Sequence, residues 1–301
     1  MKKSLLKGYA FAVMSAVIYG CMPLMAKYIY ADGVNSVTLV FLRNLLALPV
    51  LAALAYREKG SLKIPPRSLG SITLISFLGC ALTPLLLFSA YRYIASGTAT
   101  VFHYIYPAAV VVAGILFLKR PVKAVGIVSV LLCVAGVALF YDPKQAFHLG
   151  GSVLALASGI TFAGYVVLLS VFRYREVSGF LLGFYVAAAS AVMMLGFCLC
   201  SGALALPGSL WGWGLCLLFA IGITAGAVYF FQQATFLLGG EKTAILSTLE
   251  PITSVIVGVA VFHEAVGVNT LIGAVLVIAA SILIAAADAK KAPEMTEKER
   301  S

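Results

Sequence analysis

Residues 243–264 read TAILSTLEPITSVIVGVAVFHE, and residues 99–120 read ATVFHYIYPAAVVVAGILFLKR. Shifting the earlier stretch by 144 positions superposes the two without a gap, so that Pro107 falls on Pro251. The Lys-Arg end of the earlier stretch then falls on the His-Glu end of the later one. Two long apolar segments therefore share one plan and end in opposite charges.

The composition around these stretches is that of a membrane protein. Hydrophobic residues make up 62% of the chain and charged residues 11%, and the mean hydropathy is +1.06. A soluble domain with so few polar residues could not cover its surface. Backbone groups in lipid must pair within the protein, and the apolar runs lack the alternation of barrel strands. The predicted fold class is therefore all-α, in a multi-pass protein of the cell membrane.

The apolar runs are about 20 residues long, which is the length of a helix that crosses the hydrocarbon core. They predict about ten transmembrane helices, at residues 8–30, 36–56, 69–90, 95–118, 122–140, 151–172, 179–200, 210–237, 243–262 and 267–287.

Lysine and arginine gather in alternate loops, as expected when cytoplasmic loops collect positive charge. The loops assigned to the cytoplasm hold Lys2, Lys3, Lys7, Arg57, Lys59, Lys63, Arg67, Lys119, Arg120, Lys123, Arg173, Arg175, Lys242, Lys290 and Lys291. The loops assigned to the other side hold only Arg92 and Lys144. This pattern predicts an even number of spans with both termini in the cytoplasm. It also accounts for the net charge of +10 without a nucleic-acid partner, because no single basic face forms.

The repeat divides the chain into two halves of opposite topology. The first predicted helix also matches the sixth at an offset of 143, which places Ser15 on Ser158. Each half then holds five spans, and because five is odd the second half must enter the membrane from the other side. We expect repeats at residues 8–141 and 150–287, followed by a disordered cytoplasmic tail at 288–301. Such inverted repeats are an architecture of secondary transporters.

One face of the ninth predicted helix carries polar and small residues at helical spacing. They are Thr243, Ser247, Glu250, Ser254 and Gly258. The small members could serve only to bring helices close together. A carboxylate this far inside the membrane is costly, at roughly 2.5 to 3.5 kcal/mol on insertion scales. We therefore expect Glu250 to bind a proton or a substrate amine, or else to form an ion pair between helices.

The fourth predicted helix carries the corresponding polar residues. Through the offset of 144, His103 corresponds to Ser247 and Tyr106 to Glu250. His103 could titrate near neutral pH or could be a hydrogen-bonded packing residue. Pro107 and Pro251 lack a backbone N–H, so each predicts a helix break that frees a carbonyl group one turn earlier.

Further side chains in these helices complete the predicted substrate site. Tyr19, Tyr165, Phe231 and Gln232 suit a small amphipathic solute better than a bare ion. Arg43 could bind a carboxylate, although snorkelling or capping of a neighbouring helix is the commoner role of such a residue. We expect no cofactor, no metal site and no catalytic residues, and monomer and homodimer both remain open.

The chain resembles the ten-helix EamA-type branch of the drug/metabolite transporter superfamily over residues 8–287. The resemblance rests on Arg43 in FLRNLLALPVL, the LEP motif at 249–251, Glu264 after the ninth helix and Gly273 in TLIGAVL. The first half departs from the pattern, because Tyr106 and Arg120 stand where the two glutamates would be. The resemblance implies efflux or exchange of small metabolites, often amino acids, by alternating access.

The sequence thus predicts a secondary transporter rather than an enzyme, with protons as a candidate coupling ion. A flippase for a lipid-linked intermediate on the same scaffold is the alternative. An intramembrane enzyme is disfavoured because HExxH, GxSxG and paired intramembrane aspartates are all absent from the sequence. A channel would require rings of charge or a filter-like loop.

Overall fold

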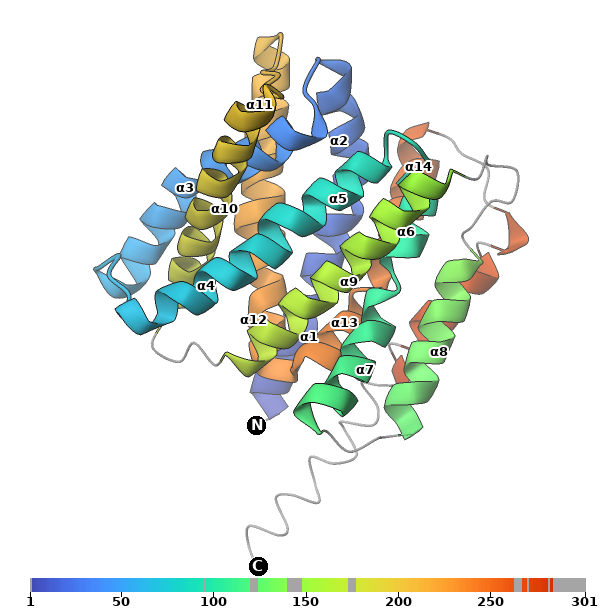
Figure 1. The fold of residues 1–301 in the computed structure, drawn as a ribbon. Coiled ribbons are helices and arrows are strands. Elements are labelled where there is room, and N and C mark those ends of the chain that lie inside the picture. Colours follow the sequence, from blue (N-terminus) through green and yellow to red (C-terminus); the bar gives the residue numbers. More distant parts are fainter. Residues whose placement is uncertain are drawn as a thin grey trace, which may run out of the picture.

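The computed structural model describes residues 2–94, 96–119, 124–139, 148–172, 177–262, 267–269, 271–280 and 282–283. All its regular elements are helices, packed as a bundle (Figure 1). The predicted tail at 288–301, with Arg120 and Glu264, lies outside the described residues.

The elements of the first half are α1 (Lys2–Gly20), α2 (Met22–Ala31), α3 (Ser36–Lys59), η1 (Pro66–Ser68), α4 (Leu69–Ile75), η2 (Ser76–Leu82), α5 (Thr83–Ala90), α6 (Ser96–His103), α7 (Tyr106–Leu118) and α8 (Ala124–Ala138). Those of the second half are α9 (Leu149–Val171), α10 (Gly179–Ser201), α11 (Leu210–Phe219), η3 (Ala220–Ala227), α12 (Val228–Leu238), α13 (Gly240–Leu246) and α14 (Leu249–Phe262). A last apolar helix covers Leu271–Ala280.

Six of the predicted spans are confirmed by helix length and hydropathy. They are Ser4–Ala31, Ser36–Lys59, Pro66–Ala90, Leu149–Val171, Gly179–Ser201 and Leu210–Leu238. The helices Tyr106–Leu118, Ala124–Ala138 and Leu271–Ala280 are apolar but shorter. The count of ten spans and the cytoplasmic position of both termini stay predictions.

The fourth and ninth predicted spans are each interrupted. The first stops at His103 and resumes at Tyr106, and the second stops at Leu246 and resumes at Leu249. In each case a proline follows within the first turn of the resumed helix, where its missing N–H is tolerated. We call α6 with α7, and α13 with α14, the two broken helices.

Two π-helical segments also lie at corresponding places. Segment η2 begins 144 residues before η3, and each interrupts the third span of its half. A π-helical turn widens the helix and is frequently found at functional sites. The local irregularities of the chain therefore follow the same offset as the sequence repeat.

The first span of each half packs mainly against helices of the other half. Helix α1 packs against α12, η3 and α14 of the second half, whereas α9 packs against α5, η2, α6 and α7 of the first. The second spans, α3 and α10, pack directly against each other. Both begin at a polar N-cap side chain and end at a left-handed glycine, Gly60 or Gly202.

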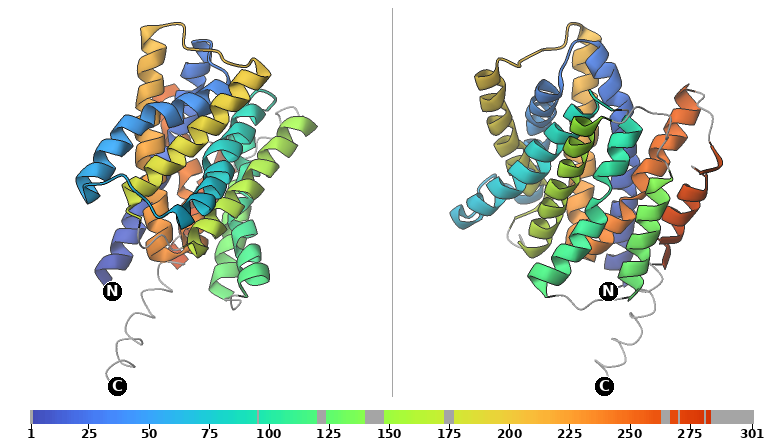
Figure 2. Two further views of the ribbon diagram at one scale, coloured as in Figure 1. Left: turned by 60° about the vertical axis from the view of Figure 1, so that its left-hand side comes forward. Right: turned by 45° about the vertical axis from the view of Figure 1, so that its right-hand side comes forward.

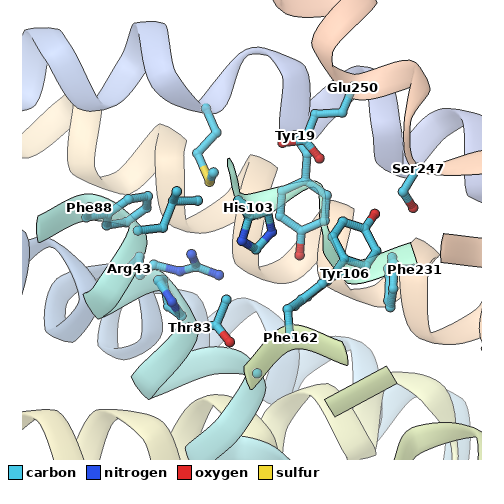
Figure 3. Close-up of a pocket in the computed structure, with 14 residues that line it drawn as sticks. Tyr19, Arg43, Thr83, Phe88, His103, Tyr106, Phe162, Phe231, Ser247 and Glu250 are labelled. Atoms are coloured by element: carbon cyan, nitrogen blue, oxygen red, sulfur yellow. The ribbon is translucent and has the colours of Figure 1, made fainter. Parts of the chain in front are cut away.

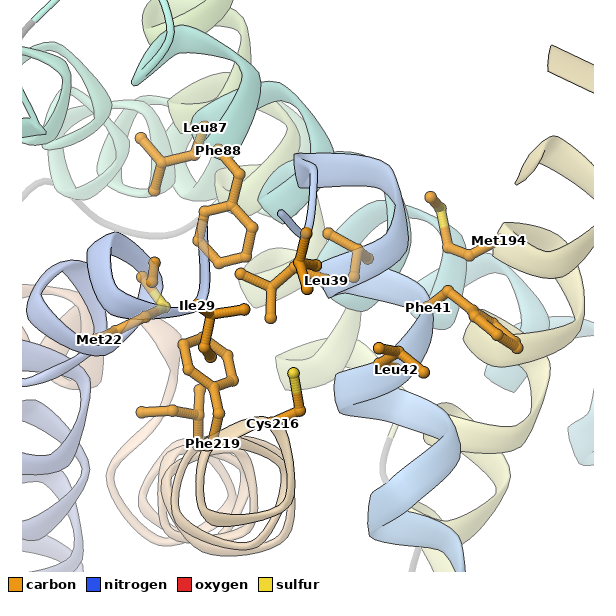
Figure 4. Close-up of a cluster of buried hydrophobic side chains, with 14 of the residues drawn as sticks. Met22, Ile29, Leu39, Phe41, Leu42, Leu87, Phe88, Met194, Cys216 and Phe219 are labelled. Carbon is orange, nitrogen blue, oxygen red and sulfur yellow. The ribbon is translucent and has the colours of Figure 1, made fainter. Parts of the chain in front are cut away.

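Helix α8 and the last helix lie together at one edge of the bundle (Figure 2). Their contact depends on two glycines, because a Cβ atom on Gly136 would meet the carbonyl oxygen of Gly273, and the reverse also holds. The rest of the interior consists mostly of apolar clusters with single polar side chains among them. One core cluster joins α2, α3, α5 and α11 through Met22, Leu39, Phe88 and Phe219 (Figure 4).

Candidate functional site

A cavity of about 50 Å³ lies inside the bundle where the two broken helices meet α1, α3, α5, α9 and α12 (Figure 3). Its walls are formed by Tyr19, Met22, Arg43, Gly79, Thr83, Pro84, Leu87, Phe88, His103, Tyr106, Phe162, Phe231, Ser247 and Glu250. A buried water needs roughly 10 to 15 Å³ on the same measure, so the cavity has room for a few waters. An organic solute would enter only if the walls moved apart.

Seven of the residues singled out from the sequence line this cavity: Tyr19, Arg43, His103, Tyr106, Phe231, Ser247 and Glu250. Two others lie behind its wall, where the amide nitrogen of Gln232 donates to the hydroxyl of Tyr165 at 3.3 Å. The side chain of Ser254 lies outside the described part of the structure.

Arg43 is buried, with 3% of its surface exposed, and projects from α3 into the cavity. Its Nε donates to the hydroxyl of Thr224 in η3 at 3.0 Å, and its guanidinium carbon lies 5.9 Å from the centre of the Phe219 ring. The expectation that Arg43 snorkels to the membrane surface is therefore wrong, because the side chain points inward and is held by the other half of the protein.

Glu250 lies in the first turn of α14, beside the break in the second broken helix. Its carboxyl group interacts with the hydroxyl of Tyr104 across the cavity. Neither Glu250 nor Arg43 has an ion-pair partner within 4.0 Å among the described residues. Figure 3 shows the two charged groups on opposite sides of the rings of Tyr19 and His103. Each charge thus faces the cavity without the other to neutralise it.

His103 ends α6 and is held by α9. Its Nδ1 lies 2.8 Å from the hydroxyl oxygen of Ser158, and that hydroxyl donates to the carbonyl oxygen of Ala155 at 2.6 Å. Because the single Ser158 proton is used there, Nδ1 must be the donor and Nε2 is left as the acceptor. This arrangement agrees with the packing role considered for His103, and it leaves one imidazole nitrogen for a ligand.

Aromatic rings form the wall between the two broken helices. The ring centres of Tyr106 and Phe162 lie 4.8 Å apart in an edge-to-face arrangement, and those of Phe162 and Phe231 lie 5.3 Å apart. Tyr165 stacks on Phe231 from behind, at 6.0 Å. These geometries are the favourable ones for aromatic pairs, so the wall is both apolar and well ordered.

Sequence reasoning missed seven lining residues: Met22, Gly79, Thr83, Pro84, Leu87, Phe88 and Phe162. Most are apolar residues of a kind that is common on every helix of the chain, so nothing in their identity separates them from lipid-facing positions. Thr83 carried a signal, because a threonine before a midhelix proline resembles the other helix breaks. Its hydroxyl donates to the carbonyl of Leu78, within the π-helical segment. The same hydroxyl lies 2.8 Å from the hydroxyl of Thr161.

The chemistry of the lining suits the binding of a polar or charged solute. It combines one guanidinium, one carboxyl and one imidazole group with three hydroxyl groups contributed by tyrosine and threonine and one by serine. Among the described residues, no group of three or more His, Cys, Asp or Glu side chains could hold a metal ion. Positive and negative groups within an apolar enclosure can bind a small molecule that carries both charges.

Comparisons with known proteins show the family and the fold. A sequence model of the EamA-like transporter family matches residues 6–141 and again residues 149–286. An uncharacterized transporter of Clostridium kluyveri is 24% identical over 294 residues, which cover 92% of each chain. An uncharacterized transporter of Haemophilus influenzae is 25% identical over 204 residues, which span 64% of this chain and 65% of that relative. A crystal structure with 17% sequence identity superposes with a TM-score of 0.74, over 94% of this chain and 96% of the other, and so shares the fold.

Proposed function

The chain belongs to the EamA-like transporter family and is a multi-pass membrane transporter, and from the cavity we propose that it is a secondary transporter of a small amphipathic metabolite. The substrate class is an amino acid or a related zwitterion, moved by efflux or exchange. Transport proceeds by alternating access, in which two inverted five-helix repeats at 8–141 and 150–287 rock about the cavity.

The observation that carries this proposal is the separation of charge in the cavity. Arg43 and Glu250 come from different halves and face the same space without pairing with each other. A zwitterion would place its carboxylate at Arg43 and its ammonium group at Glu250, with its side chain against the rings of Phe162 and Phe231. Buried charges are normally paired, so a ligand with both charges supplies what the protein lacks.

The packing of the halves supports alternating access. Because α1 and α9 are each packed on the other half, a rocking motion of one half against the other displaces walls of the cavity on both sides. The cavity has room for only a few waters in the described state, so a bulky substrate requires its walls to move during transport.

The test is uptake of a panel of labelled amino acids into proteoliposomes, with and without an imposed pH gradient. We expect the gradient to stimulate flux of at least one zwitterionic substrate. Glu250→Gln is expected to lose that stimulation, because the amide cannot release a proton.

The matched control is Glu58→Gln, which removes an exposed carboxylate near the end of α3 and should leave the flux unchanged. Flux of every substrate with the same pH dependence in Glu250→Gln as in the wild type would refute proton coupling at Glu250. Flux of none of the amino acids would refute the substrate class and direct the assay to lipid-linked sugars.

A further inference from the structure

The break in the second broken helix leaves two carbonyl groups with unusual partners. Thr248 N–H donates to Ile245 rather than to Ala244, so the Ala244 carbonyl loses its normal helical donor. The Ser247 carbonyl cannot be reached by residue 251, because Pro251 has no N–H. The Ser247 carbonyl keeps one partner in its own broken helix, the Glu250 N–H at 3.0 Å. Buried carbonyl groups are normally hydrogen-bonded, and both of these accept a bond from outside their own helix.

Both donors are tyrosines at the break of the other broken helix. The hydroxyl of Tyr104 donates to Ser247 at 3.0 Å, and that of Tyr106 donates to Ala244 at 3.4 Å. We call these two bonds the tyrosine clasp. The clasp joins α7 to α13, which are packed against each other on the side of the bundle where the N-terminus lies (Figure 1).

The other side of the bundle lacks the corresponding contact. Under the offset of 144, α6 corresponds to α13 and α7 to α14, so the counterpart of the α7–α13 contact is a contact between α14 and α6. No comparable packing of α14 on α6 is found in the described part of the chain. In the part of the chain that the structure describes, the clasp thus joins α7 to α13 on the side of the N-terminus, and the matching contact of α14 with α6 is not formed on the opposite side.

The offset names the groups that would make that second closure. Tyr106 corresponds to Glu250, and its acceptor Ala244 corresponds to Thr100. In a state that is closed on the opposite face, each half would adopt the conformation that the other half has here. The Glu250 side chain would then lie at the Thr100 carbonyl. A tyrosine hydroxyl donates to a carbonyl at any physiological pH, but a carboxyl group donates only when it is protonated.

We propose that Glu250, once protonated, closes the opposite face of the transporter by donating a hydrogen bond to the carbonyl of Thr100, as Tyr106 does to Ala244 in the described state. An ionised Glu250 has no proton to donate, so it cannot form a hydrogen bond with the Thr100 carbonyl. The opposite face would then stay open. This inference rests on the alternating access of the proposed function. It adds the physical step by which a proton decides which side is open.

None of the described groups that face Glu250 offers another donor that is gained or lost with a proton. They are Tyr19 of α1, Arg43 of α3, Tyr91 after α5, His103 of α6 and the two clasp tyrosines. Arg43 already donates to the hydroxyl of Thr224. His103 is bound to Ser158, and Glu250 is the only carboxyl group of the lining. In the described state the Glu250 carboxyl group interacts with the Tyr104 hydroxyl, whose proton is donated to the Ser247 carbonyl.

The test measures the distance between α7 and α13 by electron paramagnetic resonance. Spin labels are placed through Phe117→Cys and Lys242→Cys, in a background in which Cys21 and Cys200 are replaced by serine. In the otherwise unmutated protein we expect one short distance at pH 8 and a second, longer distance at pH 5. A distance distribution that is the same at both pH values would overturn the proposal.

Three variants at Glu250 separate the hydrogen bond from the charge. Glu250→Gln keeps a donor and Glu250→Tyr supplies a hydroxyl, so both should show the longer distance at pH 8 as well as at pH 5. Glu250→Ala removes charge and donor together and should show only the short distance at both. Equal distributions in the Gln and Ala variants would overturn the proposal, because then charge alone would matter.

The distance measurement is independent of the transport assay. The expected distances without flux of any amino acid would refute the proposed substrate class and leave the inference standing. Flux stimulated by a pH gradient together with an unchanging distance would refute the inference and leave the proposed function standing.

Discussion

The two broken helices have the same backbone arrangement but different polar side chains at the break. Both break one turn before a proline, and the breaks are related by the same offset as the sequence repeat and the π-helical segments. In the first broken helix the polar groups at the break are bound within the protein, since His103 is held by Ser158 and Tyr106 by a carbonyl. In the second, Glu250 faces the cavity.

This difference shows where function enters a duplicated scaffold. A repeat supplies two corresponding breaks. In the described state the second break leaves the Ala244 carbonyl without its helical donor, whereas the corresponding Thr100 carbonyl keeps the Tyr104 N–H at 3.0 Å. In the described state tyrosine hydroxyl groups of the first copy donate to carbonyl groups of the second. Under the proposal above, a protonated Glu250 of the second copy donates to the first in the alternative state. The repeated backbone would then allow two states, and the difference in side chains would make them respond to a ligand.

The largest effect is expected from removing the cation that the first half contributes to the cavity. Arg43→Met should lower amino-acid flux at a fixed low concentration by about 10- to 100-fold, because a hydrogen bond to a charged group contributes about 1.5 to 3 kcal/mol. The measurement is initial flux in proteoliposomes. Arg57→Met, which removes an exposed arginine from the same helix, is the control and should leave the flux unchanged. Equal flux in the two variants would show that Arg43 does not bind the substrate.

A second test breaks the support of the first broken helix without touching the cavity. A Cβ atom on Gly159 of α9 would overlap the carbonyl group of His103, whereas one on Gly164 would lie 3.5 Å from Leu78, an ordinary contact. Gly159→Ala is expected to lower the free energy of unfolding by about 1 to 3 kcal/mol. Gly164→Ala should be close to neutral. Thermal unfolding in detergent would measure both, and equal melting temperatures would contradict the close approach of α9 to α6.

Much of the fold could be predicted because lipid imposes simple rules on a sequence. Span length and hydropathy located the six long helices, and a carboxylate in the middle of an apolar run marked Glu250. The prolines Pro107 and Pro251 indicated where the fourth and ninth helices would be disturbed. These features depend on local sequence and on the solvent, so they do not require knowledge of which helices touch.

The features that could not be predicted depend on contacts between distant segments. Nothing local separates the cavity-lining Phe162 from other phenylalanines of the chain. The inward position of Arg43 follows from a partner, Thr224, that lies 181 residues away. The π-helical segments likewise contain no residue type that requires them. The sequence therefore indicated which helices carry the polar groups, and packing decided which of those groups share one cavity.

The smallest expected effect concerns a connection between the halves on the face opposite the N-terminus. Asp32, in the turn after α2, accepts hydrogen bonds from the hydroxyl and the backbone N–H of Ser209, at 2.6 and 3.1 Å. Asn35 and Thr38 both donate to the carbonyl of Ala203 in the same loop. These bonds tie the turn before α3 to the loop before α11 on the side where α6 and α14 are not packed together.

The hydrogen bond from the Ser209 hydroxyl holds the pKa of Asp32 below its ordinary value of 3.8. A carboxyl group whose pKa is lower in the folded protein than in the unfolded chain stabilises the fold above the unfolded pKa, and that contribution is lost as pH falls through the folded one. Asp32→Asn should therefore have a slightly lower melting temperature than the wild type at pH 7. The difference should begin to shrink as pH falls below about 4 and should vanish only below the folded pKa of Asp32. Ser209→Ala, which removes the donor, should weaken the same pH dependence. A difference that persists unchanged to pH 3 would mean that the Asn variant loses packing rather than the charged hydrogen bond, and that the loops are joined mainly through Asn35 and Thr38.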